Sequence, residues 1–156
     1  MFKLATLLAV MLAGALSQGK GDTKDVPATA RKATYALVVN ANNKTTESGD
    51  AAKAVIKKLY LKDLTQWVGG TEAKPYSREA ASAAQVAFLK DVLGMSESEL
   101  ARHWLKLKNM NGSTPPKEVD TDRMVLKYVA KSEGAFGVVT VDAAKGAEGV
   151  KVLFEF

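Results

Sequence analysis

The chain contains no cysteine and only one histidine, His103. The absence of cysteine excludes disulfide bonds, thiol catalysis, cysteine zinc sites and lipid attachment to an N-terminal cysteine. A single histidine is too few for a histidine-rich metal site or for the paired histidines of a zinc-peptidase motif. We therefore expect no metal and no other cofactor, and a fold that is stabilised by its hydrophobic core alone.

Aromatic residues and an excess of one charge are also scarce. The 156 residues carry a formal net charge of +5, and 7% of them are aromatic. A protein that binds nucleic acid usually shows clustered Lys and Arg residues, often with aromatic residues between them, and no such run is present. We therefore expect no nucleic-acid partner. The proportions of hydrophobic residues (47%) and charged residues (25%) are typical of one globular domain of ordinary size.

Only one apolar run is long, and it lies at the start of the chain. It extends from Leu4 to Leu16 and follows Lys3, and both Ala13-Gly14-Ala15 and Ala15-Leu16-Ser17 at its end fit a small-x-small pattern. The run is short for a membrane span, and small residues at this place are typical of signal-peptide cleavage. We expect residues 1–17 to be a signal peptide and the protein to be periplasmic or secreted, without a stable membrane span. The alternative is an uncleaved membrane anchor.

The rest of the chain is predicted to form a polar, flexible leader (residues 18–34) and one domain (residues 35–156). Apolar and β-branched runs predict strands at Tyr35–Asn40, Ala73–Tyr76, Ala135–Val141 and Val150–Phe156. Apolar residues at helical spacing predict helices at Asp50–Lys62, Ser77–Leu93, Asp120–Lys131, and after the capping box of Ser96 and Glu99. This order predicts an α/β fold: a single three-layer-like domain with a mixed sheet flanked by helices.

Two finer expectations concern the core. Alternation in the last segment predicts one shared face for Val150, Val152, Phe154 and Phe156. Trp67 and Trp104 each follow a helical pattern, and large aromatic side chains supply much of a protein's buried surface. Both tryptophans are therefore expected in the core.

The sequence gives no support for catalysis. Neither Ser77 nor Ser82 lies in a Gly-x-Ser-x-Gly motif, and His103 has no visible nucleophile beside it. No glycine-rich segment ends in the Gly-Lys-Ser/Thr of a phosphate-binding P-loop. We therefore expect a protein that is not an enzyme.

A binding role has better support, in the segment that contains Ser77, Arg78 and Ser82. These residues lie around the start of a predicted helix, where unpaired backbone N–H groups and a partial positive charge favour an anion. Arg78 would add a charged contact and Ser82 a hydroxyl donor. We predict Ser77, Arg78 and Ser82 as contacts to a small oxyanion. The simpler alternative is that Ser77 caps the helix and that Arg78 is a solvated surface residue.

Five segments, in this order, resemble phosphate-binding proteins of ABC transporters, which have the type II periplasmic binding protein fold. The segments are YALVVNANN (35–43), VIKKLYLKDLTQWVGG (55–70), SREAASAAQVAFLKDVLG (77–94), ARHWLKLKNMNGSTPP (101–116) and VLKYVAKSEGAFGVV (125–139). Residues 133–139 resemble the Pro-Gly-Ala-Ile-Gly-Tyr-Val signature of that family. The resemblance implies the fold of the second of the two lobes that close on the ligand in that family.

The family's anion-binding loop is only partly kept. In the family it has the pattern Arg-x-Asp-x-Ser-Gly-Thr before a phenylalanine, and Arg78 and Ser82 match its arginine and serine. Alanines occupy the positions of the aspartate, glycine and threonine: Ala80, Ala83 and Ala84. The resemblance implies that the family's aspartate accepts the proton of hydrogen phosphate, which an alanine cannot do. Such a site would be weak.

Two functions follow from these observations. The first is binding of a small oxyanion, phosphate being the expected one, for ABC-type uptake with a permease or a second lobe-like chain as partner. The second is a protein-interaction module of the envelope, built on the same scaffold after the loss of ligand binding. Arg78 and Ser82 favour the first function, and the three alanines favour the second.

Overall fold

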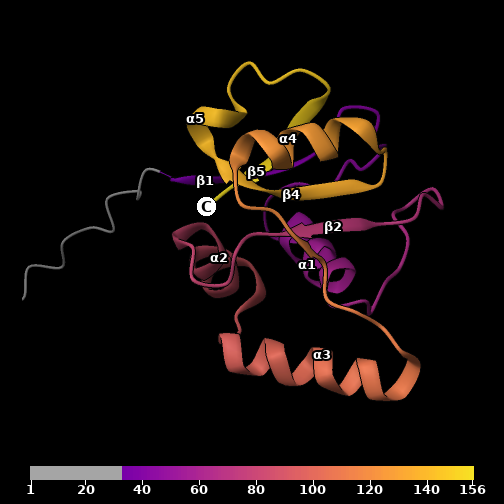
Figure 1. The fold of residues 1–156 in the computed structure, drawn as a ribbon. Helices are drawn as coiled ribbons and strands as arrows, with labels where there is room; N and C mark the ends of the chain where they lie inside the picture. The colour runs from indigo at the N-terminus through magenta and orange to yellow at the C-terminus, as the bar shows by residue number, and fades with distance from the viewer. Residues whose placement is uncertain (1–32) are drawn as a thin grey trace, which may run out of the picture. The chain divides into compact units, whose positions relative to one another are not determined.

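A computed structural model describes residues 33–156, so the predicted signal peptide and nearly all of the predicted leader lie outside the described residues. Five strands form one sheet in the order β3-β2-β4-β1-β5. The elements are β1 (Tyr35–Asn40), α1 (Gly49–Tyr60), β2 (Lys74–Ser77), α2 (Ala83–Phe88), a π-helical turn η1 (Leu89–Leu93), α3 (Glu97–Asn111), β3 (Lys117–Glu118), α4 (Asp122–Lys131), β4 (Ala135–Thr140), α5 (Val141–Ala144) and β5 (Val150–Glu155) (Figure 1).

The sheet is mixed, as predicted. Strand β1 is antiparallel to both of its neighbours, β4 and β5, whereas β2 is parallel to β4 and to the short edge strand β3. The central strands β1 and β4 are buried at almost every position. Strands that are buried on both faces read as continuous apolar runs, which is why the sequence marks these two so clearly.

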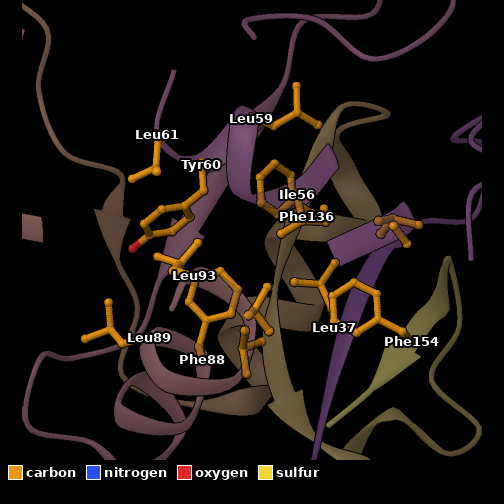
Figure 2. Close-up of a cluster of buried hydrophobic side chains, with 14 of the residues drawn as sticks. Leu37, Ile56, Leu59, Tyr60, Leu61, Phe88, Leu89, Leu93, Phe136 and Phe154 are labelled. Carbon is orange, nitrogen blue, oxygen red and sulfur yellow. The ribbon is translucent and has the colours of Figure 1, made fainter. Parts of the chain in front are cut away.

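One face of the sheet is covered by α1, α2 and η1. Figure 2 shows the cluster of side chains between them, with Leu37 and Phe136 from the strands facing Ile56, Tyr60 and Phe88 from the helices. The rings of Tyr60 and Phe88 meet edge to face, with centroids 5.0 Å apart. Edge-to-face pairs add to the stabilisation from burial alone.

Trp67 belongs to the same cluster, which confirms that it is a core residue. Its ring meets the ring of Phe136 edge to face, with centroids 5.5 Å apart. Its indole N–H donates a hydrogen bond of 2.9 Å to the carbonyl of Gly134. The loop that follows α1 is therefore fixed to the start of β4.

The opposite face of the sheet is covered by α4 and α5, which completes three layers (Figure 1). Val125 and Val129 of α4 are fully buried in a second cluster with Val38 and Val139 of the central strands. The predicted three-layer α/β domain is thus confirmed.

Strand β5 departs from the predicted alternation. Its pairing with β1 shifts between Leu37, opposite Phe154, and Val38, opposite Val152, so that Leu153 is an extra residue. Val150 therefore lies against the α4 cluster, whereas Phe154 belongs to the cluster on the other face. The prediction of one shared face is wrong, because a β-bulge reverses the side on which later residues point.

The strand ends beside the first described residues. The N–H groups of Thr34 and Tyr35 donate to the carbonyl of Phe156 at 3.1 and 3.0 Å, and the N–H of Phe156 donates back to Tyr35. Residues 34–35 and residue 156 are thus joined at one edge of the sheet.

The helix predicted at Ser77–Leu93 begins later than expected. Ser77 is the last residue of β2, and its carbonyl accepts a hydrogen bond of 2.9 Å from the N–H of Val119. The helix instead begins after Ser82, whose hydroxyl caps it by accepting from the N–H of Gln85 at 3.2 Å. Ser77 is therefore not a helix cap.

Helix α3 stands apart from the sheet (Figure 1). The predicted capping box of Ser96 and Glu99 is present at its start. Trp104 is its one buried residue, at 5% exposure, which confirms the second tryptophan as a core residue. Leu105 and Met110 are exposed at 58% and 68%.

Candidate functional site

The end of β2 and the start of α2 meet α1 in a closed ring of four hydrogen bonds. The hydroxyl of Tyr60 donates to that of Ser77 (3.1 Å), which donates to the carbonyl of Arg78 (3.0 Å). The N–H of Arg78 donates to the side-chain oxygen of Gln85 (3.1 Å), and the Gln85 amide donates to Tyr60 (3.3 Å). All four residues are buried, so the ring fixes the loop after β2.

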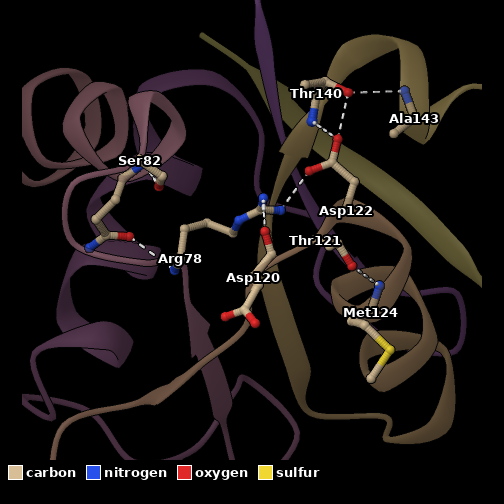
Figure 3. Close-up of polar contacts among 9 residues, drawn as sticks. Arg78, Ser82, Asp120, Thr121, Asp122, Met124, Thr140 and Ala143 are labelled. Carbon is tan, nitrogen blue, oxygen red and sulfur yellow. Dashed lines mark hydrogen bonds and ion pairs between the residues drawn. The ribbon is translucent and has the colours of Figure 1, made fainter.

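Arg78 is a buried residue, at 8% exposure, rather than the solvated surface residue of the simpler alternative. One terminal nitrogen of its guanidinium lies 2.5 Å from a carboxylate oxygen of Asp122, and the other donates to the carbonyl of Asp120 at 2.8 Å. The side chain extends away from Ser82 toward the start of α4 (Figure 3). Its charge is therefore balanced by Asp122.

Asp122 is itself held in place by the end of β4. Its second carboxylate oxygen accepts from the Thr140 hydroxyl at 2.7 Å and from the Thr140 N–H at 3.1 Å. Partial burial opposes its ionisation, but the hydrogen bonds from Thr140 and the hydrogen bond and charge of Arg78 outweigh it, so the pKa lies below its ordinary value of 3.8. Asp122 is thus an anionic anchor that orients the guanidinium.

The guanidinium keeps unused donors. A guanidinium has five N–H groups, and two hydrogen bonds are assigned to the terminal nitrogens of Arg78. Its Nε is buried and has no hydrogen-bond partner. A buried donor without a partner costs about 1–3 kcal/mol, so an acceptor placed beside this atom would be favoured.

The three predicted contacts do not converge. The Ser77 hydroxyl is bound within the ring, the Ser82 oxygen caps α2, and the Arg78 guanidinium lies at Asp122. The residues that the sequence analysis missed are Asp122 and Thr140. Both are far from Arg78 in the chain, and no local pattern links them to it.

A pocket of about 410 Å³ adjoins the ring of four hydrogen bonds. The ring residues form one side of it, and α3 and the segment before β3 form the other. The lining includes Ala80 and Trp104 but not Ser82. The concave part of this region therefore lies on the α3 side of the loop.

The described residues, 33–156, hold no group of three or more His, Asp or Glu side chains that could bind a metal ion. Within the same range, no helix has both the length and the apolar character that a membrane crossing needs.

No protein-family model matches the chain, and no curated protein matches it. Solved structures do. A Clostridium perfringens protein assigned to the phosphate ABC transporter substrate-binding proteins, solved with bound phosphate, has 21% identity and a TM-score of 0.57 over 78% of this chain and 44% of its own. An ABC-type phosphate transport receptor from Vibrio cholerae has 21% identity and a TM-score of 0.57, over 78% of this chain and 45% of its own. PstS from Borrelia burgdorferi has 11% identity and a TM-score of 0.58, over 78% of this chain and 46% of its own.

The chain has the fold of one lobe of a phosphate-type substrate-binding protein. It spans less than half the length of the solved chains it matches. The resemblance that the sequence motifs predicted is thus confirmed at the level of the fold. These neighbours are substrate-binding proteins of transporters and not enzymes.

Proposed function

We propose that this protein is a non-enzymatic binding protein for a small oxyanion, phosphate in the first instance, with Arg78 as its charged contact. The observation that carries the proposal is the buried guanidinium whose Nε has no partner. Two further observations support it. Asp122 and Thr140 orient the guanidinium, and one of the similar structures holds phosphate. A guanidinium held in place in this way loses little conformational entropy when an anion binds.

The site is expected to be weak and poorly selective. Asp122 already balances the charge of Arg78, the Ser77 hydroxyl donates within the chain, and the Ser82 oxygen is held as the cap of α2. Ala80 offers no acceptor for the proton of hydrogen phosphate. Phosphate and sulfate are therefore expected to bind with similar affinities, in the millimolar range and more weakly as salt is added.

The first test is titration calorimetry of the purified chain with phosphate and with sulfate in low salt. Arg78→Ala should weaken binding at least tenfold, because the charged contact is lost. Arg123→Ala removes the same charge from an exposed position on α4 and should change the affinity less than twofold. Absence of binding of either anion at millimolar concentration would remove the proposal.

If Arg78→Ala folds poorly, a second variant can still test Arg78 as the anion contact. Asp122→Asn frees the guanidinium from its counter-charge, so phosphate should bind about tenfold more tightly than to the unmodified chain. Phosphate should also raise the melting temperature of this variant more than that of the unmodified chain. A variant that stays folded and gains no affinity would count against Arg78 as the contact.

We further propose export, with residues 1–17 as the signal peptide, and a role in ABC-type uptake. The similar solved structures are transport receptors and substrate-binding proteins, which supports this setting. Because the site described above presents a single loop, a permease or a second lobe-like chain would supply the rest of the ligand's surroundings. Detection of the mature chain in a periplasmic or culture fraction, cleaved after about residue 17, would test the export step.

The envelope interaction module remains a second candidate, because α3 exposes Leu105 and Met110 on a helix with little contact to the sheet. Changing both residues to serine should abolish capture of a specific envelope protein without changing anion binding. Retention of the same partner by the double variant would reject this surface.

A further inference from the structure

The pocket beside α3 has a largely apolar wall. Its volume is about 410 Å³, within the range of small-molecule sites. Apolar side chains line it from η1, from α3 and from the segment before β3: Leu89, Leu100, Ala101, Leu105, Pro115 and Pro116. Inorganic phosphate has no apolar surface to place against such a wall, so the pocket suits a different kind of ligand.

The charged residues around the pocket do not favour a ligand of either charge. Two acidic residues, Glu97 and Glu118, and one basic residue, Lys108, line it and are exposed. The remaining charged residue of the lining, Arg78, is paired with Asp122. Mixed and exposed charges of this kind are screened by solvent and favour neither an anion nor a cation strongly.

Two residues of the lining carry a buried donor without a partner: Arg78, through the Nε described above, and Trp104. The indole nitrogen of Trp104 is buried and has no hydrogen-bond partner. Buried tryptophan N–H groups usually find a partner, as that of Trp67 does with the carbonyl of Gly134. An acceptor that reaches this nitrogen from the pocket would form the missing hydrogen bond.

We propose that this pocket is a second binding site, for a small neutral amphipathic molecule with an aliphatic body and a carbonyl-type acceptor. The aliphatic body lies against the wall formed by η1 and α3, and the acceptor receives the N–H of Trp104. Arg78 also lines this pocket, but its terminal nitrogens bind Asp122 and the carbonyl of Asp120, so the proposed ligand is held by Trp104 and the apolar wall and not by the guanidinium.

The test uses four small probes: hexanamide, hexanoate, hexylammonium and acetamide. Together they distinguish the contribution of the aliphatic chain from the effect of a charge on the ligand. Binding is followed on the full chain by ¹H–¹⁵N spectra of the two indole N–H groups. Hexanamide should shift the Trp104 signal downfield and leave the Trp67 signal in place, because Trp67 already has its acceptor. Acetamide lacks four methylenes and should bind at least about tenfold more weakly. Hexanoate and hexylammonium should also bind more weakly than hexanamide.

Two matched variants test whether hexanamide binds in this pocket. Ala101→Phe fills the pocket and should weaken hexanamide binding at least tenfold, whereas Lys106→Phe adds the same ring to an exposed position of α3 outside the lining and should not. Phosphate binding should be unchanged in both. The proposal is overturned if 20 mM hexanamide leaves the Trp104 signal unmoved, if hexanoate binds as tightly as hexanamide, or if Ala101→Phe has no effect. None of these results touches the oxyanion proposal, which is decided by phosphate and Arg78.

Discussion

Asp122→Ala is expected to destabilise the fold by about 3 kcal/mol, because it leaves the buried guanidinium of Arg78 without its counter-ion. The loss also removes the acceptor for the Thr140 hydroxyl and N–H. Domains of this kind have only about 5–15 kcal/mol of stability in total, so the effect is large. Urea unfolding followed by circular dichroism measures it directly.

The matched control removes both charges together. A double variant with Arg78→Met and Asp122→Leu has no unpaired buried charge and should recover the part of the lost stability that comes from that charge, while the Thr140 donors stay without their acceptor. If Asp122→Ala alone costs less than about 1 kcal/mol, the pair is exposed to solvent in solution and does not hold the loop after β2.

The same carboxylate predicts a pH dependence. Its pKa is lower in the folded chain than the ordinary value of 3.8, so its stabilising contribution is fully present above about pH 4. The contribution is lost as the pH falls below that value and through the folded pKa. The difference in stability between the unmodified chain and Asp122→Ala should therefore be constant from pH 5 to 7 and shrink below about pH 4.

Gly134→Ala is expected to be equally damaging, for a steric reason. A Cβ at this position would lie 1.8 Å from the carbonyl oxygen of Glu72, a backbone atom that cannot move without the whole loop. The carbonyl of Gly134 also accepts hydrogen bonds from Trp67 and from the N–H of Lys74. We expect a loss of about 3 kcal/mol and a melting temperature lower by roughly 10 °C.

Gly137→Ala, three residues later and within β4, is the comparison for this prediction. There the added Cβ would meet a side-chain methyl of Val125 at 2.7 Å, and a side chain adjusts more readily than a backbone carbonyl. Gly137→Ala should therefore cost less. Equal melting temperatures for Gly134→Ala and the unmodified chain would show that the loop at Glu72 is not held against β4.

Much of this fold is predictable because its signals are local. The β-branched run at Tyr35–Asn40 predicts β1 with its observed bounds, and the capping box at Ser96 marks the start of α3. In both cases the residues that define the element are neighbours in the chain. Packing against the rest of the domain then agrees with the local preference.

The predictions from sequence are wrong where contacts between residues far apart in the chain determine the local structure. Ser77 and Ser82 are both competent helix caps, and the choice between them is made by the pairing of β2 with β3, which keeps the chain extended through Ser77. The bulge in β5 depends on its register with β1. Alternation within one strand does not reveal either contact.

The sequence predicts only one residue of the charged pair in the candidate site, for the same reason. Arg78 is identified from its place in a motif, but its partner Asp122 lies 44 residues later and belongs to the first turn of another helix. A single sequence contains no signal for that pairing. The unpartnered N–H of Trp104 likewise becomes visible only when its surroundings are known.

The hydrogen bonds that join Phe156 to Thr34 and Tyr35 bring the two ends of the domain to one corner of the sheet. A domain with adjacent ends tolerates circular permutation and insertion into a host protein. A short linker from residue 156 to residue 34, with new termini opened in the exposed turn at Gly112, would leave the sheet and the loop after β2 intact.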